Sequence, residues 1–89
     1  MKGIITVVGK DRVGIIAKVC SFLSNEGINI LDISQTIVQG YFTMMMIVDI
    51  TETSDRLEGL AESLKTLGEE IGVQIKFQHE DIFNTMHRV

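Results

Sequence analysis

The stretch that decides the fold is Ile4-Ile5-Thr6-Val7-Val8-Gly9-Lys10-Asp11-Arg12-Val13-Gly14-Ile15, and a helical pattern after it closes on Gly27-Ile28-Asn29-Ile30-Leu31. This order predicts a strand, a turn containing two glycines, a helix over about Val13 to Glu26, a glycine stop and a second strand. A helix start presents backbone N–H groups and a partial positive charge, which suit a small anion or carboxylate. Gly9 and Gly14 allow close approach of a ligand or a neighbouring backbone, and Asp11 can cap the helix. The stretch therefore predicts a place that holds a small molecule.

The rest of the chain repeats the order of strand, helix and strand. A broadly alternating segment, Ile28 to Gln39, meets Gly40, which predicts a tight hairpin turn into a strand over Tyr41 to Ile50. A second helix is expected to begin near Thr53 or Ser54, either of which can cap it, and to end at Gly72. Alternation from Val73 to Gln78 then predicts the last strand.

These elements predict an α+β, ferredoxin-like βαββαβ sandwich. Right-handed crossovers place the four antiparallel strands in the order 4-1-3-2, with both helices on one face of the sheet. The chain is expected to form one domain, 1–89, with its core in 4–78. The tail, 80–89, carries Ile82, Phe83 and Met86, which predict a short amphipathic helix that docks on the body or on a partner.

The expected buried faces follow from the same periodicities. One helix stripe consists of Ile16, Val19, Cys20 and Leu23, and the second of Leu57, Leu60, Ala61, Leu64, Leu67 and Ile71. The third strand is expected to bury Phe42, Met44, Met46, Val48 and Ile50. The opposite sheet face would carry Ile4, Thr6 and Val8, which is more apolar than a solvated face needs and predicts a homodimer.

Composition narrows the class of function. The chain has 89 residues, 45% of them hydrophobic, and a formal charge of −4, which argues against nucleic acid or an anionic membrane as the main partner. One cysteine, Cys20, cannot form an internal disulfide, and its place on the helix stripe favours a buried role over a nucleophile. With no apolar run long enough to span a bilayer, the protein is expected to be cytoplasmic.

Metal and cofactor chemistry is not expected. His79 and His87 lack a partner at ligand spacing and are expected at the surface. The side chains of Met44, Met45 and Met46 alternate between the two sheet faces, so they favour adaptable packing over a thioether metal site. No paired carboxylates in a predicted cleft suggest acid–base catalysis, so no enzyme activity is expected.

The segments Thr6 to Ile15 and Gly27 to Gln35 together resemble the ACT domain. The likeness is strongest to small stand-alone ACT proteins and to single halves of the glycine cleavage system regulators, and Thr43-Met44-Met45-Met46 also resembles that subgroup. It covers nearly the whole chain, from Ile4 to about Gln78. The resemblance implies a regulatory module that binds an amino acid or related metabolite between subunits. Carried onto this chain, the implied ligand-binding residues are Gly9, Asp11, Val13, Gly14 and Ile15 of one subunit with Asn29 and Ile30 of its neighbour.

Plainer interpretations stay open beside this one. Asp11 and Gly14 can be ordinary helix-start chemistry, and Asn29 can simply satisfy backbone groups. An acylphosphatase-type enzyme is suggested by Val38-Gln39-Gly40, but that segment falls in the predicted hairpin and no arginine follows it. An RNA-recognition module is suggested by Gly40-Tyr41, but further stacking aromatics are missing.

The predicted function is therefore a non-catalytic regulatory domain that binds a small amino-acid-like effector at a homodimer interface and signals to a regulated protein partner. The alternative is a structural dimerisation module without a small-molecule ligand.

Overall fold

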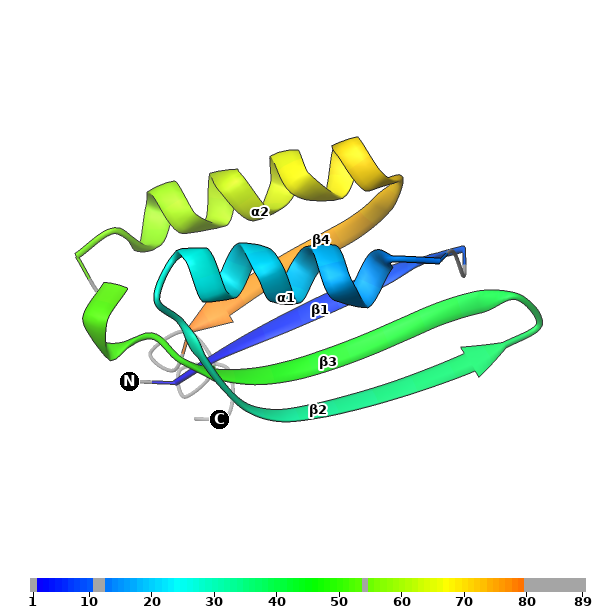
Figure 1. Cartoon of the computed structure of the whole chain (residues 1–89), viewed down its shortest axis with the longest axis horizontal. Helices are drawn as coiled ribbons and strands as arrows, with labels where there is room; N and C mark the ends of the chain where they lie inside the picture. Colours follow the sequence, from blue (N-terminus) through cyan, green and yellow to red (C-terminus); the bar gives the residue numbers. More distant parts are fainter. Residues whose placement is uncertain (1, 11–12, 54, 80–89) are drawn as a thin grey trace, which may run out of the picture.

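The computed structural model describes residues 2–10, 13–53 and 55–79 and shows two βαβ halves joined by a hairpin (Figure 1). In chain order the elements are β1 (Lys2–Lys10), α1 (Ile15–Asn25), β2 (Asn29–Val38), β3 (Tyr41–Asp49), a 3-10 turn (Thr51–Thr53), α2 (Leu57–Ile71) and β4 (Val73–His79).

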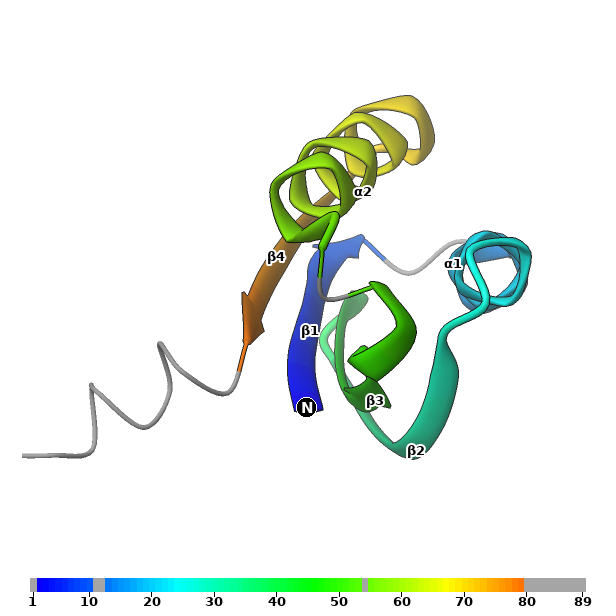
Figure 2. The same cartoon turned by 90° about the vertical axis from the view of Figure 1, so that its left-hand side faces the viewer.

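The strands form one four-stranded sheet in the order β2-β3-β1-β4, and every neighbouring pair is antiparallel. The helices lie together on one side of this sheet (Figure 2). The predicted ferredoxin-like architecture and strand order are therefore confirmed. Since β1 pairs with both β3 and β4, β2 and β4 are the two edges of the sheet.

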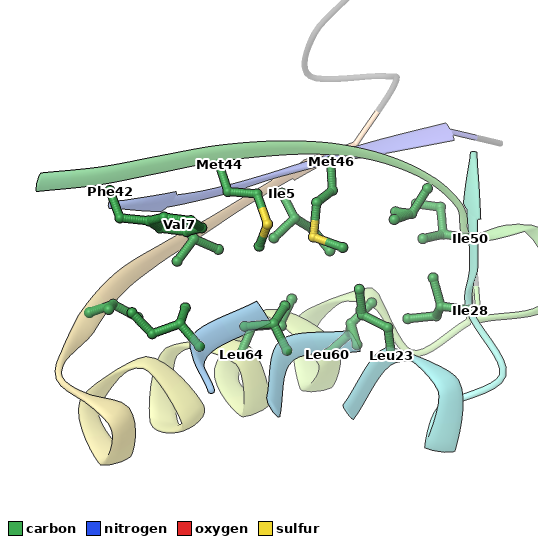
Figure 3. Close-up of a cluster of buried hydrophobic side chains, with 14 residues drawn as sticks. Ile5, Val7, Leu23, Ile28, Phe42, Met44, Met46, Ile50, Leu60 and Leu64 are labelled. Carbon is green, nitrogen blue, oxygen red and sulfur yellow. The ribbon is translucent and has the colours of Figure 1, made fainter. Parts of the chain in front are cut away.

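The core lies between the sheet and the helices, where alternate strand residues meet one stripe of each helix (Figure 3). Met44 and Met46 of β3 are completely buried there, which confirms their predicted role as packing residues. Their neighbour Met45 is half exposed on the other face of the sheet. Below we name these two faces the inner face, which the helices cover, and the outer face.

The buried stripe of α1 differs from the predicted one. Ile15, Val19 and Leu23 are buried, whereas Ile16 is 38% exposed and Cys20 is only half-buried. The helix begins after Gly14, whose φ is +92°, and this start turns Ile15 rather than Ile16 toward the sheet. Both residues are isoleucine, so hydrophobic periodicity alone could not separate the two phases.

Glycines end both helices and shape the hairpin, as predicted. The N–H of Gly27 donates to the Ser24 carbonyl at the end of α1, and Gly72 adopts a left-handed φ of +80° at the end of α2. The loop between β2 and β3 consists of Gln39 (φ +51°) and Gly40 (φ +80°). Positive φ at both positions is the geometry of a type I′ turn, which matches the twist of the two strands.

The predicted start of α2 at Thr53 or Ser54 is wrong, because the helix begins at Leu57 after Arg56, whose side chain does not cap it. The Thr53 hydroxyl donates instead to the Ile50 carbonyl over 3.2 Å, within the 3-10 turn that follows β3. The Thr53 hydroxyl, which was predicted to cap α2, is therefore engaged in this turn. Ser54 lies outside the described residues.

No helix within the described residues is long and apolar enough to cross a membrane. The predicted tail helix, with Ile82, Phe83, Met86 and His87, lies outside the described residues.

Candidate functional site

The first half of the candidate site is the start of α1. Gly14 occupies the N-cap position, and no side chain of the described residues caps the helix. The Gly14 carbonyl accepts the first helical bond, from the Lys18 N–H at 3.0 Å. The N–H groups of Ile15, Ile16 and Ala17 therefore have no acceptor within the helix. They are the donors that a carboxylate can accept from.

Open space adjoins these donors. A Cβ added at Gly14 would meet no atom of the described residues within 4 Å, and the left-handed φ of this residue favours glycine whatever the space. Val13, just before it, is fully exposed. Asp11, the expected cap and ammonium acceptor, lies outside the described residues.

Gly9 has a clear packing role. A Cβ at this position would lie only 2.7 Å from Cγ1 of Val73, its register partner on β4. The close approach that this glycine allows is therefore that of a neighbouring strand residue. Ile15 is buried at 3% exposure, so its side chain belongs to the core and only its N–H can serve a ligand.

The second half of the candidate site lies at the opposite end of the protomer. Asn29 at the start of β2 pairs with Asp49, whereas Lys10 at the end of β1 pairs with Tyr41. Asp49 and Tyr41 are the two ends of β3 and lie about 27 Å apart at about 3.4 Å per residue. The structure thus does not bring Asn29 and the β1–α1 turn together within one chain.

Asn29 is exposed and borders a shallow depression of about 400 Å³, lined by Gly27, Asn29, Asp49, Thr51 and Glu52. Ile30 beside it is half-buried and packs against the core. Two carboxylates and an amide give this end of the sheet an acidic, hydrogen-bonding character. The sequence carries no local signal that Asp49, Thr51 and Glu52 belong to this site, because it is the pairing of β2 with β3 that places Asp49 and the residues after it beside Asn29.

Asp49 is held in its ionised form. One oxygen of its carboxylate accepts from the Thr51 hydroxyl at 2.6 Å and from the Thr51 N–H at 3.0 Å. These two hydrogen bonds lower the pKa of Asp49, the hydroxyl contributing most. Nearby positive charge, including that of Lys2, its register partner on β1, lowers the pKa further, so the carboxylate is negatively charged at neutral pH.

The edge strand β2 connects the two ends of the sheet, from Asn29 at one end to Val38 at the end that carries the β1–α1 turn. Every residue from Leu31 to Val38 is exposed. Ile33 and Ile37 point to the inner face, opposite Met46 and Phe42, yet they are 42% and 55% exposed. Ile16 of α1 is a further exposed isoleucine, and we name these three residues the edge patch: Ile16, Ile33 and Ile37.

Other chemistry finds little support in the described part of the chain. No group of three His, Cys, Asp or Glu residues there could hold a metal ion. Val38, Gln39 and Gly40, the segment that suggested an acylphosphatase, lie at the hairpin between β2 and β3, as expected. Tyr41, which suggested an RNA-recognition module, is exposed. His79 ends β4, and His87 lies outside the described residues.

Known protein families and relatives show which proteins this chain is similar to. The model of the ACT domain matches residues 3–78. A UPF0237 protein of Bifidobacterium longum is 54% identical over 88 residues, covering 99% of this chain and 98% of its own.

Solved structures agree with the sequence match. An ACT domain protein from Streptococcus pneumoniae superposes with a TM-score of 0.85 at 43% identity, over 93% of both chains. A putative glycine cleavage system transcriptional repressor superposes with a TM-score of 0.73 at 27% identity, over 86% of this chain and 44% of that one.

Proposed function

Because this chain belongs to the ACT-domain family, we propose that it is a non-catalytic regulatory domain that binds a small amino-acid-like effector between two copies of itself. One observation carries the proposal. The start of α1 presents N–H donors that no side chain within residues 2–10, 13–53 and 55–79 caps, beside a Gly14 whose added Cβ would meet none of those residues within 4 Å. The likeness to a putative transcriptional repressor supports a regulatory role in which effector binding is signalled to another protein.

A two-fold arrangement of copies would complete the site. If the β2 edges of two copies pair antiparallel, the start of one β2 lies beside the end of the other. Val38 at the end of β2 pairs with Tyr41, and Tyr41 pairs with Lys10, so this end of the sheet also carries the β1–α1 turn. Asn29 of the partner subunit would then approach the start of α1. The separation of about 27 Å within one chain is thereby removed.

The edge patch supports this mode of association. Ile33 and Ile37 are exposed apolar residues on a strand edge that has no partner among the described residues, and Ile16 is a third exposed isoleucine, at the start of α1. A second copy would bury these residues together with its own and would pair the open backbone groups of β2. A dimer through the β2 edge is therefore an alternative to the expected dimer through the outer face, with Ile4, Thr6 and Val8.

The chemistry of the two halves suits a zwitterion. The carboxylate of an amino acid would accept from the N–H groups at the start of α1, which the helix dipole makes favourable. Its ammonium group would face the partner's end of the site, where Asn29 offers an amide oxygen and Asp49 an ionised carboxylate. Charge at both ends of the pocket favours ligands that carry both charges.

The alternative is a dimerisation module without a small-molecule ligand. It is favoured by the packing roles of Gly9, Ile15 and Ile30, which show that part of the implied site serves the fold itself. The same β2 pairing would then serve assembly alone.

A screen of the twenty amino acids against the purified protein tests the proposal by thermal shift and calorimetry. A true effector at a hundredfold its Kd stabilises the native state by about 2.7 kcal/mol. Asn29→Ala should abolish the shift, whereas Gln74→Ala, which removes an exposed amide on the far edge strand, should preserve it. No binding by any amino acid, or binding that Asn29→Ala leaves intact, would contradict the intersubunit site and favour the dimerisation module.

A further inference from the structure

The outer face of the sheet has an apolar centre between two polar edges. In register order, one row across the strands reads Gln78, Ile4, Ile47 and Asp32, and the next reads Lys76, Thr6, Met45 and Ser34. Both helices cover the opposite face (Figure 3). Met45 is 49% exposed and Val8 is 40% exposed, and no element within the described residues covers them. We name this centre the outer patch: Ile4, Met45 and Ile47.

The chain leaves the sheet next to this patch. His79, the last residue of β4, pairs with Gly3, and the preceding pair joins Gln78 to Ile4. Residues 80–89 follow directly from this corner. From β4 across β1 and β3 to β2 is three strand spacings, or about 14 Å. A helix over the nine residues 81–89 would extend about 13.5 Å, so its length matches the width of the sheet.

The sequence of residues 80–89 matches the surface that it would cross. Ile82, Phe83, Met86 and Val89 have the spacing of one helix face. The acidic pair Glu80 and Asp81 comes first, beside the β4 edge that carries Lys76, and Arg88 comes near the end, where the β2 edge carries Asp32. Apolar residues would thus meet the apolar centre, and each charged end would meet the opposite charge.

We propose that residues 80–89 of the same chain dock as a short helix across the outer face and cover the outer patch. Intramolecular docking is favoured over a second copy, because a segment tethered one strand away has an effective concentration in the millimolar range. The helix would lie on the outer face and not beside the free backbone groups of β2, so docking leaves that strand edge available for self-association. The outer face would then be an internal surface, and the expected dimer through Ile4, Thr6 and Val8 would be excluded.

Methyl NMR on the full chain tests the contact directly. With 13C-methyl methionine, the Met45 methyl is expected to show an NOE to the Phe83 ring, and Phe83→Leu should move the Met45 resonance by removing the ring current. Asn84→Ala, on the opposite face of the predicted tail helix, serves as the matched control and should leave that resonance in place. Met44 and Met46, buried on the inner face, report that the fold is intact.

Three results would overturn the proposal. These are the absence of the NOE, a Met45 resonance that ignores Phe83→Leu, and an NOE between separately labelled copies in a mixed sample, which would assign the contact to a second molecule.

Thiol labelling gives a second readout that does not depend on assignment. In a Cys20→Ser background, the thiol introduced by Met45→Cys should react about tenfold faster after Phe83→Ser, the ratio that a closed-state preference of about 1.4 kcal/mol gives. The thiol introduced by Lys65→Cys, on an exposed site of α2, should react at the same rate with and without Phe83→Ser. Equal acceleration at both sites, or no acceleration at position 45, would refute the docking.

Discussion

The packing of α2 on β4 makes a sharp prediction for a matched pair of glycines. Gly68 and Gly59 lie on the same helix. A Cβ at Gly68 would lie 2.7 Å from the carbonyl oxygen of Val73 and 3.1 Å from Cγ1 of Ile75, whereas a Cβ at Gly59 would meet nothing within 4 Å. Both glycine-to-alanine changes gain helix propensity, but only one of them forces the helix away from the sheet.

The magnitude follows from the difference between the two variants. Replacing glycine by alanine inside a helix stabilises it by about 0.5–1 kcal/mol, and this gain is common to both. Overpacking against a fixed neighbour costs about 1–3 kcal/mol, and the Val73 carbonyl cannot yield easily because β4 is paired to β1. Gly59→Ala should therefore be stabilised, and Gly68→Ala should lie about 1–3 kcal/mol below it.

Urea unfolding followed by far-UV circular dichroism measures this difference. Both variants must be compared at one protein concentration, because self-association shifts apparent stability. For a domain of this size each kcal/mol corresponds to about 4–8 °C in Tm, so thermal unfolding gives an independent check. If Gly68→Ala proved as stable as Gly59→Ala, the close contact between α2 and β4 would be refuted.

Three further changes test other parts of the account. Ile37→Lys should weaken self-association in sedimentation experiments, because it places a charge in the edge patch, and a dimer that tolerates it would exclude the β2 edge as the interface. Thr51→Val should reduce the stability at neutral pH that the lowered pKa of Asp49 supports. That contribution is present above the ordinary aspartate pKa of about 3.9 and is lost as the pH falls through the lower pKa of the folded state. The unfolding free energies of wild type and variant should therefore converge in acid. A gap between them that stays constant down to acid pH would contradict this role of Thr51. Gln39→Gly should stabilise the hairpin by up to about 1 kcal/mol in urea unfolding, because φ is +51° there, and a loss of stability would count against the type I′ turn.

The fold was largely predictable because its signals are local and agree with one another. Alternate positions from Phe42 to Ile50 are all apolar and identify the buried face of β3, and glycines at 27, 40 and 72 mark the turns. Two details were not predictable in this way. Adjacent isoleucines at 15 and 16 fit the stripe of α1 equally well, and the hydroxyl of Thr53 suits either a helix cap or the 3-10 turn that it forms.

The candidate site was harder to predict because it is not local. Sequence motifs mark the β1–α1 turn and Asn29, but only the register of β3 reveals that they lie at opposite ends of one protomer. The same register places Asp49 beside Asn29, a neighbour twenty positions away in the chain that no motif indicates. The packing role of Gly9 was also not predictable from the sequence. Strand pairing places Val73 against Gly9, and no local motif indicates which neighbour approaches a glycine.

The dimer dissociation constant, measured by analytical ultracentrifugation with and without each amino acid, tests the intersubunit site most directly. If the monomer does not bind, each site in the dimer tightens self-association by about a hundredfold when the ligand is present at a hundred times its Kd. The account predicts that at least one amino acid has this effect and that Asn29→Ala removes it. A ligand that binds with measurable affinity yet leaves the dimer constant unchanged would contradict it.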